Sequence, residues 1–161
     1  MLEELNVPFE LRVVAIRIYE SVISKFSNME GWSKDINCNI GVKQGFPLSP
    51  VFFGIYIDKL EGCLEEASCV VTFLARIVII LLLYADNIVL LARCTYNLDK
   101  QLILLKDFCS TMVMTVNTHK KKVMIMNPKK DTYANFLYDN SNLEEVSSYK
   151  YLAIGIHHKL N

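Results

Sequence analysis

The sequence predicts an α+β fold, and three observations predict it. Apolar residues recur at helical spacing in residues 8–26, 49–67 and 95–112. Residues 70–92 are instead rich in β-branched side chains, which favour strands. These segments follow one another without regular alternation and without an internal repeat, and that order is typical of mixed helices and antiparallel strands.

The first segment is expected to form a helix that starts at Pro8 and runs to about Phe26. Proline suits the first turn of a helix because its missing N–H would have no partner there. The apolar stripe of this helix would consist of Leu11, Val14, Ile18 and Val22. Residues 28–31 end the helix, and the loose alternation of residues 32–40 indicates a short hairpin or an edge strand.

Gly41 to Pro50 contains two glycines and two prolines in ten residues, so it must be a shaped loop. The hydroxyl of Ser49 could cap a second helix that has Pro50 at its first position and continues to about Ala67.

Val70 to Ala92 is the most apolar stretch of the chain. Its β-branched content predicts strands buried on both faces, Ile77–Leu83 and Ile88–Ala92, with Asp86 at the tip of a buried hairpin. A small membrane protein built on this stretch is an alternative. Arg76, Asp86 and Asn87 interrupt it, however, and leave no clean span of the roughly 20 residues that a bilayer requires.

A third helix should open at Thr95 or Asn97, with an apolar face of Leu98, Leu102, Leu105 and either Phe108 or Cys109. After it, Thr115–Asn117 and Val123–Asn127 are expected to be short strands around a lysine-rich turn. The last part of the chain predicts a β-meander over residues 136–138, 143–146 and 149–156.

Composition limits the class of protein. The 161 residues are enough for about one domain, and a hydrophobic content of 52% with a mean hydropathy of +0.26 suits the inner piece of a larger assembly. The charge is balanced, with 17 basic and 17 acidic residues, unlike a self-contained nucleic-acid binder. Five cysteines without a Cys-x-x-Cys pair exclude a zinc or disulfide framework, and the acidic N-terminus is not a signal peptide, so a cytosolic or nuclear location is expected.

Three motifs resemble the palm domain of a reverse transcriptase, most closely that of non-LTR (LINE-type) retrotransposons. They are Gly-Val-Lys-Gln-Gly-Phe-Pro-Leu-Ser-Pro at residues 41–50, Tyr-Ile-Asp at 56–58, and Tyr-Ala-Asp-Asn at 84–87. The resemblance spans nearly the whole chain. It implies a polymerase palm, with an antiparallel sheet and helices packed on one face. It also divides the chain into the end of the fingers (1–48), a palm core (49–127) and a primer-grip-like meander (131–161).

The resemblance also implies RNA-directed DNA polymerase activity, in which two Mg²⁺ ions assist nucleotidyl transfer. Asp86 would bind metal, while Tyr84 and Ala85 shape the turn. Tyr151 and Leu152 would belong to the primer grip, and Lys120 would lie near the triphosphate. The residues expected at the nucleotide or the template are Lys43, Gln44, Gly45, Pro47 and Ser49. The implied partners are an RNA template, a DNA primer and deoxynucleoside triphosphates.

The chain departs from the family pattern at several positions. Asn87 stands where the family has a second aspartate, and Val113 and Ala153 stand where it has glycine. The aspartate of the first catalytic strand, the fingers and the thumb have no counterpart here. We therefore expect a catalytically inactive fragment. The alternative is a non-catalytic module that binds RNA or protein through the basic run Lys120–Lys122.

Overall fold

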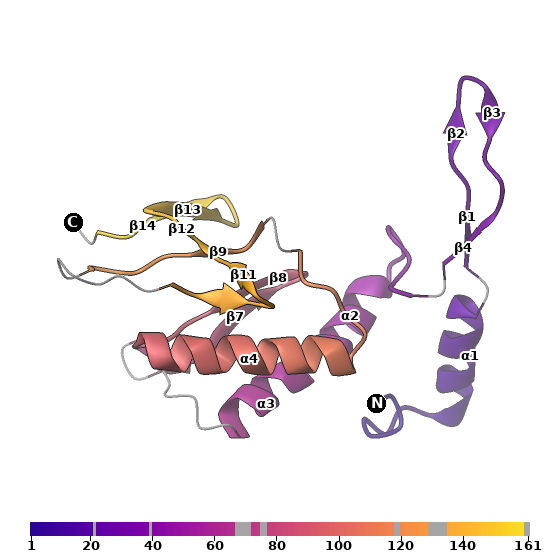
Figure 1. Ribbon diagram of the computed structural model, residues 1–161. Helices are drawn as coiled ribbons and strands as arrows, with labels where there is room; N and C mark the ends of the chain where they lie inside the picture. Colours follow the sequence, from indigo (N-terminus) through magenta and orange to yellow (C-terminus); the bar gives the residue numbers. More distant parts are fainter. Residues whose placement is uncertain are drawn as a thin grey trace. The chain divides into compact units, whose positions relative to one another are not determined.

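The computed structural model describes residues 1–20, 22–38, 40–66, 72–74, 77–117, 120–128 and 135–159 (Figure 1). The chain divides into two compact units, Met1–Lys59 and Leu60–Asn161. Both contain helices and strands, so the predicted α+β class is confirmed. Parts of two expected segments, residues 70–71, 75–76 and 129–134, lie outside the described residues.

In the first unit, helix α1 spans Phe9–Tyr19, directly after Pro8. The prediction that it would reach Phe26 is wrong, because residues 22–38 pair into one extended hairpin (Figure 1). The Cys38 N–H donates to the Val22 carbonyl over 2.8 Å, which fixes the base of this hairpin. Its strands, in chain order, are β1 (Ile23–Ser24), β2 (Ser27–Asn28), β3 (Gly31–Trp32) and β4 (Ile36–Asn37).

Helix α1 buries none of its residues. Two members of the expected apolar stripe, Leu11 and Val14, are 59% and 52% exposed. The helical spacing was therefore read correctly in this segment, but the stripe does not form a core.

The predicted helix over residues 49–67 forms as two helices, α2 (Ser49–Ile57) and α3 (Lys59–Glu66). The backbone of Asp58 between them remains helical, at φ −53° and ψ −36°, and its N–H donates to the Gly54 carbonyl over 3.0 Å. Within the second unit, α3 contributes the buried side chains of Leu60 and Leu64.

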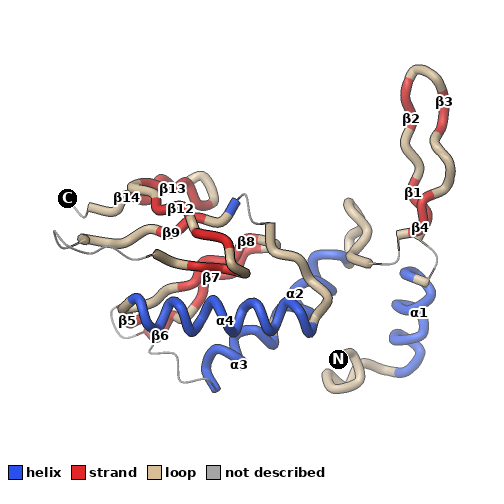
Figure 2. Tube along the Cα trace, in the orientation of Figure 1, coloured by secondary structure: helices blue, strands red, loops and turns tan. Residues whose placement is uncertain are grey.

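The strands of the second unit occur as two-stranded pairs, shown in red in Figure 2. Four pairs are antiparallel: β5 (Thr72–Leu74) with β6 (Ile77–Ile79), β7 (Leu81–Tyr84) with β8 (Asn87–Leu90), β10 (Leu137–Tyr138) with β11 (Ser141–Asn142), and β13 (Ser148–Tyr151) with β14 (Ile154–His157). Strand β9 (Lys122–Val123) instead pairs in parallel with β12 (Glu144–Glu145). Strands do form in the three segments expected for a meander, but the pairing differs: residues 137–138 pair with 141–142, the segment 149–156 folds into a hairpin of its own, and 144–145 pairs in parallel with β9.

Two predictions for the middle of the chain have clear outcomes. The strands β5 to β8 exclude a continuous helix through residues 70–92, as expected. Within the described ranges, no helix is long and apolar enough to cross a bilayer. The expected strand at Thr115–Asn117 is absent, and the one expected at Val123–Asn127 is confined to Lys122–Val123.

Helix α4 (Thr95–Thr111) forms the core of the second unit. Its buried side chains Leu102, Leu105, Phe108 and Cys109 agree with the predicted apolar face, and α4 contacts β10. Gln101, also on this helix, is fully buried, and its Nε2 donates to the Leu91 carbonyl over 3.0 Å. This bond holds the end of β8 against α4 and thereby positions the β7–β8 hairpin.

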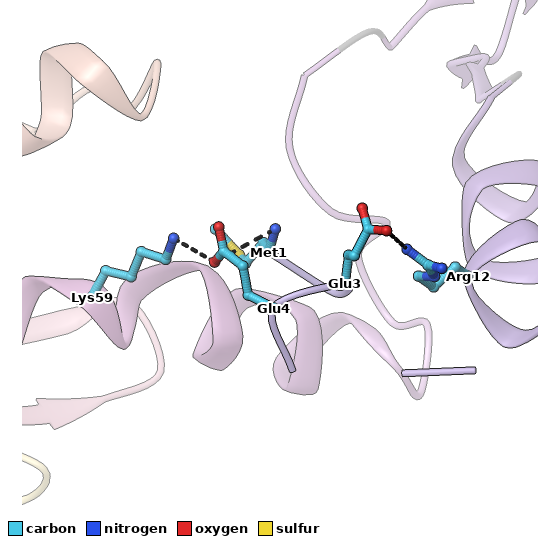
Figure 3. Close-up of polar contacts among 5 residues, drawn as sticks. All are labelled: Met1, Glu3, Glu4, Arg12 and Lys59. Carbon is cyan, nitrogen blue, oxygen red and sulfur yellow. Dashed lines mark hydrogen bonds and ion pairs between the residues drawn. The ribbon is translucent and has the colours of Figure 1, made fainter. Parts of the chain in front are cut away.

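The N-terminal residues of the first unit are held by ion pairs (Figure 3). The carboxylate of Glu4 lies 2.7 Å from Lys59 Nζ, and that of Glu3 lies 3.0 Å from Arg12 Nη1. The Lys59 ammonium lowers the pKa of the Glu4 carboxyl, because it donates a hydrogen bond to the charged form. Within the first unit, these contacts tie the segment before α1 to Arg12 on that helix and to Lys59, the unit's last residue.

Candidate functional site

The Tyr84–Asn87 motif forms the tip of the β7–β8 hairpin. Tyr84 pairs with Asn87 as the last residues of the ladder, so Ala85 and Asp86 are the two central residues of a tight turn. Ala85 has φ 50°, a left-handed conformation that residues with a Cβ rarely adopt. The predicted strand–turn–strand arrangement is confirmed at the tip, but the first arm, expected as one strand over Ile77–Leu83, is divided into β6 and β7, which pair with different strands.

The same hairpin is more open than the sequence indicated. Leu82 and Leu83 are 38% and 39% exposed, and Asp86 itself is exposed. The prediction of strands buried on both faces is therefore wrong for β7. The reason is that, among the strands that the structure describes, β7 pairs with β8 alone. Residues 88–90 of β8 are half-buried and Leu91 bonds to Gln101 of α4, whereas most of β7 stays exposed, unlike a strand within a wider, helix-flanked sheet.

The side chains at the tip interact with each other. Asn87 Nδ2 donates a hydrogen bond to Asp86 Oδ1 over 3.3 Å. Carboxylate oxygens are suitable ligands for Mg²⁺, but a two-metal centre needs carboxylates that bridge both ions. Over the described part of the chain, no three His, Cys, Asp or Glu side chains gather as a possible metal site. This donor set does not fit a pair of Mg²⁺ ions.

The Gly41–Pro50 loop is a structured element of the first unit. Gly41 and Gly45 have φ 92° and 77°, conformations that require glycine. Two turns close the loop, since the Phe46 N–H donates to the Lys43 carbonyl over 3.2 Å and the Ser49 N–H donates to the Phe46 carbonyl over 3.0 Å.

Ser49 does not cap α2, contrary to the prediction. It is the first residue of the helix, after Leu48, and no side chain caps this end. Its hydroxyl is buried and lies 2.6 Å from the Lys43 carbonyl and 3.0 Å from the Tyr19 hydroxyl. Ser49 therefore fixes the loop rather than presenting a hydroxyl to a ligand, whereas Gln44, Gly45 and Pro47 are exposed.

The basic run Lys120–Lys122 is not one exposed surface. Lys120 is exposed, but Lys122 forms an ion pair with Glu144 across the β9–β12 pair. Lys121 Nζ is buried over the ring of Tyr138, 3.2 Å from its centroid, and burial lowers the pKa of this amine. Burial also raises the pKa of Tyr138 to about 12. This arrangement disagrees with an RNA-binding patch that uses all three lysines.

Tyr151 and Leu152 lie at the turn between β13 and β14. Tyr151 ends β13, and the two central residues of the turn, Leu152 and Ala153, have φ 48° and 69°. Val113, the other position at which glycine was expected, has φ 51°. Both departures from the family pattern therefore fall where the backbone is left-handed.

The expected site residues are divided between the two units. Lys43, Gln44, Gly45, Pro47 and Ser49 lie together in the first, while Tyr84–Asn87, Lys120, Tyr151 and Leu152 belong to the second. Sequence reasoning missed Tyr19 and Gln101, which hold the loop and the hairpin, respectively. The sequence signal that could have identified Gln101 is a glutamine next to the apolar face of a predicted helix. The sequence offers no comparable signal for Tyr19.

Comparison with known proteins assigns the family. Residues 3–156 match the family described as Reverse transcriptase (RNA-dependent DNA polymerase). The chain therefore belongs to the reverse transcriptase family. No match was found among curated proteins.

Proposed function

We propose that this chain is the palm region of a non-LTR-type reverse transcriptase and that it does not catalyse nucleotidyl transfer. The observation that supports it most is the Tyr84–Asn87 turn at the tip of a β-hairpin, within a chain that matches the family over residues 3–156. In this proposal Asp86 is the carboxylate of the polymerase turn, and Asn87 marks the lost one.

The remaining roles follow the same proposal. The Gly41–Pro50 loop would meet the nucleotide and the template through Lys43, Gln44, Gly45 and Pro47, while Ser49 would hold the loop in shape. Lys120 would face the triphosphate, and the β13–β14 turn with Tyr151 and Leu152 would contact the primer. The partners would be an RNA template with its DNA primer and deoxynucleoside triphosphates. The segment boundaries 1–48, 49–127 and 131–161 belong to this proposal too.

The proposed inactivity rests on the metal ligands. Mg²⁺ is the cofactor expected for the family, and Asp86 offers it one carboxylate. Asn87 offers a neutral amide beside it in place of a second carboxylate, so the turn supplies one negative charge where two ions need bridging acids. The aspartate in the sequence before Gly41 is Asp35, whose Oδ1 lies 2.9 Å from Lys25 Nζ. It is held in the β1–β4 hairpin region and is not a candidate for the bridging ligand.

Primer extension tests the proposal. The 161-residue chain should give no detectable extension of a DNA primer on an RNA template with Mg²⁺, and Asn87→Asp alone should not restore it. Template-dependent synthesis by the unmodified chain, abolished by Asp86→Ala, would disprove the inactivity.

Metal binding gives a second readout that does not depend on activity. Asn87→Asp replaces a hydrogen-bond donor with a second carboxylate, so Mn²⁺ should bind this variant more tightly than it binds the unmodified chain. Asp86→Ala combined with Asn87→Asp is the matched control, because it has one carboxylate at the tip again. Equal Mn²⁺ affinity for the unmodified chain and Asn87→Asp would contradict the placement of a metal at this turn.

A further inference from the structure

Tyr19 connects the end of α1 to the Gly41–Pro50 loop. Its ring makes edge-on contacts with Phe46 and Phe52, at centroid distances of 6.2 and 5.5 Å and interplanar angles of 85° and 78°. Its hydroxyl lies 3.0 Å from Ser49 Oγ. One side chain, located 22 residues or more before the loop in sequence, thus contacts the loop and the helix that follows it.

The hydrogen bonds in this group have a defined direction. A serine hydroxyl has one proton, and Ser49 donates it to the Lys43 carbonyl over 2.6 Å. The Tyr19 hydroxyl must therefore be the donor to Ser49 Oγ. The result is a relay from Tyr19 through Ser49 to the main chain of Lys43. Because Ser49 is only 6% exposed, water cannot easily replace either bond.

The side chain of Lys43 also depends on Tyr19. Its ammonium lies 5.9 Å from the ring centroid of Tyr19 and 5.9 Å from that of Phe46. Both distances are within the range of a cation–π attraction, which limits where a long, flexible side chain can point. Tyr19 thus acts on the carbonyl of Lys43 through the relay and on its ammonium through the ring.

We propose that Tyr19 is a positioning residue, which holds Lys43 and the surrounding loop in one conformation for contact with a phosphate-bearing ligand. The role rests on the proposed function of the loop. A lysine that is already restrained loses less rotamer entropy when it binds a phosphate than a free one does. Tyr19 acts through Lys43 and is not expected to touch the ligand.

Hydrogen exchange tests the positioning directly and needs no ligand. Tyr19→Phe keeps the ring contacts and removes the donor, so exchange at the amides of Phe46 and Ser49 should speed up about two- to tenfold. Ser49→Ala removes the same relay from its other end and should affect the Phe46 amide similarly. Tyr96→Phe is the matched control, since Tyr96 is 73% exposed and lies on α4 in the other unit. No change at these amides, or the same change throughout the unit, would overturn the proposal.

A double-mutant cycle tests whether Tyr19 acts through Lys43. Affinity for a short RNA–DNA hybrid at low salt would be measured for the unmodified chain, Tyr19→Phe, Lys43→Met and the double variant. Tyr19→Phe should weaken binding several-fold, and this loss should disappear in the Lys43→Met background. Additive losses would overturn the proposal. Hybrid binding unaffected by Lys43→Met would instead disprove the loop's proposed function, while the exchange result would still decide the role of Tyr19.

Discussion

Two hairpins of the second unit have the same turn geometry, but the central residues of one turn are polar and those of the other are apolar. In β10–β11 the two central residues are Asp139 and Asn140, with φ 50° and 60°. In β13–β14 they are Leu152 and Ala153, with φ 48° and 69°. Both central residues are left-handed in each case, as in the turns that match the twist of a two-stranded ribbon.

The difference shows what imposes the turn in each hairpin. Asp and Asn tolerate the left-handed region, so the β10–β11 turn favours its own geometry, and its ladder has only two residue pairs. Leu and Ala oppose that geometry by about 1 kcal/mol each, yet the turn forms, between strands joined by four residue pairs. In the second hairpin the ladder imposes the turn, and the strain remains in the folded state.

The largest effect is expected from relieving that strain. Leu152→Asn combined with Ala153→Gly should raise the free energy of unfolding by about 2 kcal/mol, because both new residues accept positive φ. Urea denaturation measures it as a higher midpoint with an unchanged slope. Asn140→Gly is the control in the other hairpin and should change stability by only a few tenths of a kcal/mol. Equal gains in the two hairpins would refute the distinction.

The C-terminus of α4 is a third place where a residue other than glycine adopts a left-handed conformation. The Val113 N–H donates to the Ser110 carbonyl over 3.3 Å, and the Met114 N–H donates to the Cys109 carbonyl over 2.8 Å. This is the Schellman pattern, whose left-handed position usually holds glycine. Here it holds Val113, a β-branched residue at φ 51°.

Val113→Gly should therefore raise the free energy of unfolding by about 1 kcal/mol. Val113→Ala tests the same point, since it removes the branch and keeps the Cβ, and its gain should be smaller. Thermal unfolding followed by circular dichroism would report both. A loss of stability in Val113→Gly would mean that the side chain makes contacts worth more than the strain.

These positions show what the sequence could predict about the fold. The whole of α4 follows from a local apolar pattern and was predicted, whereas the expectation of glycine at Val113 and Ala153 came from the family resemblance. The end of α1 was not predicted, because pairing of residues 22–28 with 31–38 overrides their helical spacing. The parallel pairing of β9 with β12 joins segments 22 residues apart, and no local pattern specifies such a contact.

The same division applies to the candidate site. The Tyr84–Asn87 turn is local and was placed correctly, although its exposure depends on which strands neighbour it. Ser49 looked like a helix cap because of its position before Pro50, yet its hydroxyl bonds to residues brought close by the fold. Lys121 belonged to a basic run that the alternative hypothesis used to bind RNA or protein, and only the packing of Tyr138 against it reveals that its amine is buried.

The smallest effect is expected from a substitution of Asp139 in the β10–β11 hairpin, which separates the contribution of its charge from that of the turn geometry. Asp139 Oδ1 lies 2.8 Å from Lys106 Nζ on α4, and this hydrogen-bonded pair lowers the pKa of Asp139 and raises that of Lys106. Asp139→Asn removes the charge and keeps a residue that accepts positive φ. It should lower the unfolding midpoint by less than the changes above, because both partners are exposed.

The pH dependence identifies the cause of that small loss. A carboxyl with a lowered pKa stabilises the folded state above its unfolded pKa of about 3.8, and the stabilisation disappears as the pH falls through the lowered, folded value. The unmodified chain and Asp139→Asn should therefore differ at pH 6 and converge in acid, and 1 M salt should reduce the difference at pH 6. Lys106→Met is the matched control and should abolish the same difference. A gap between the two chains that persists below the folded pKa would mean that Asp139 stabilises the turn through its backbone conformation alone.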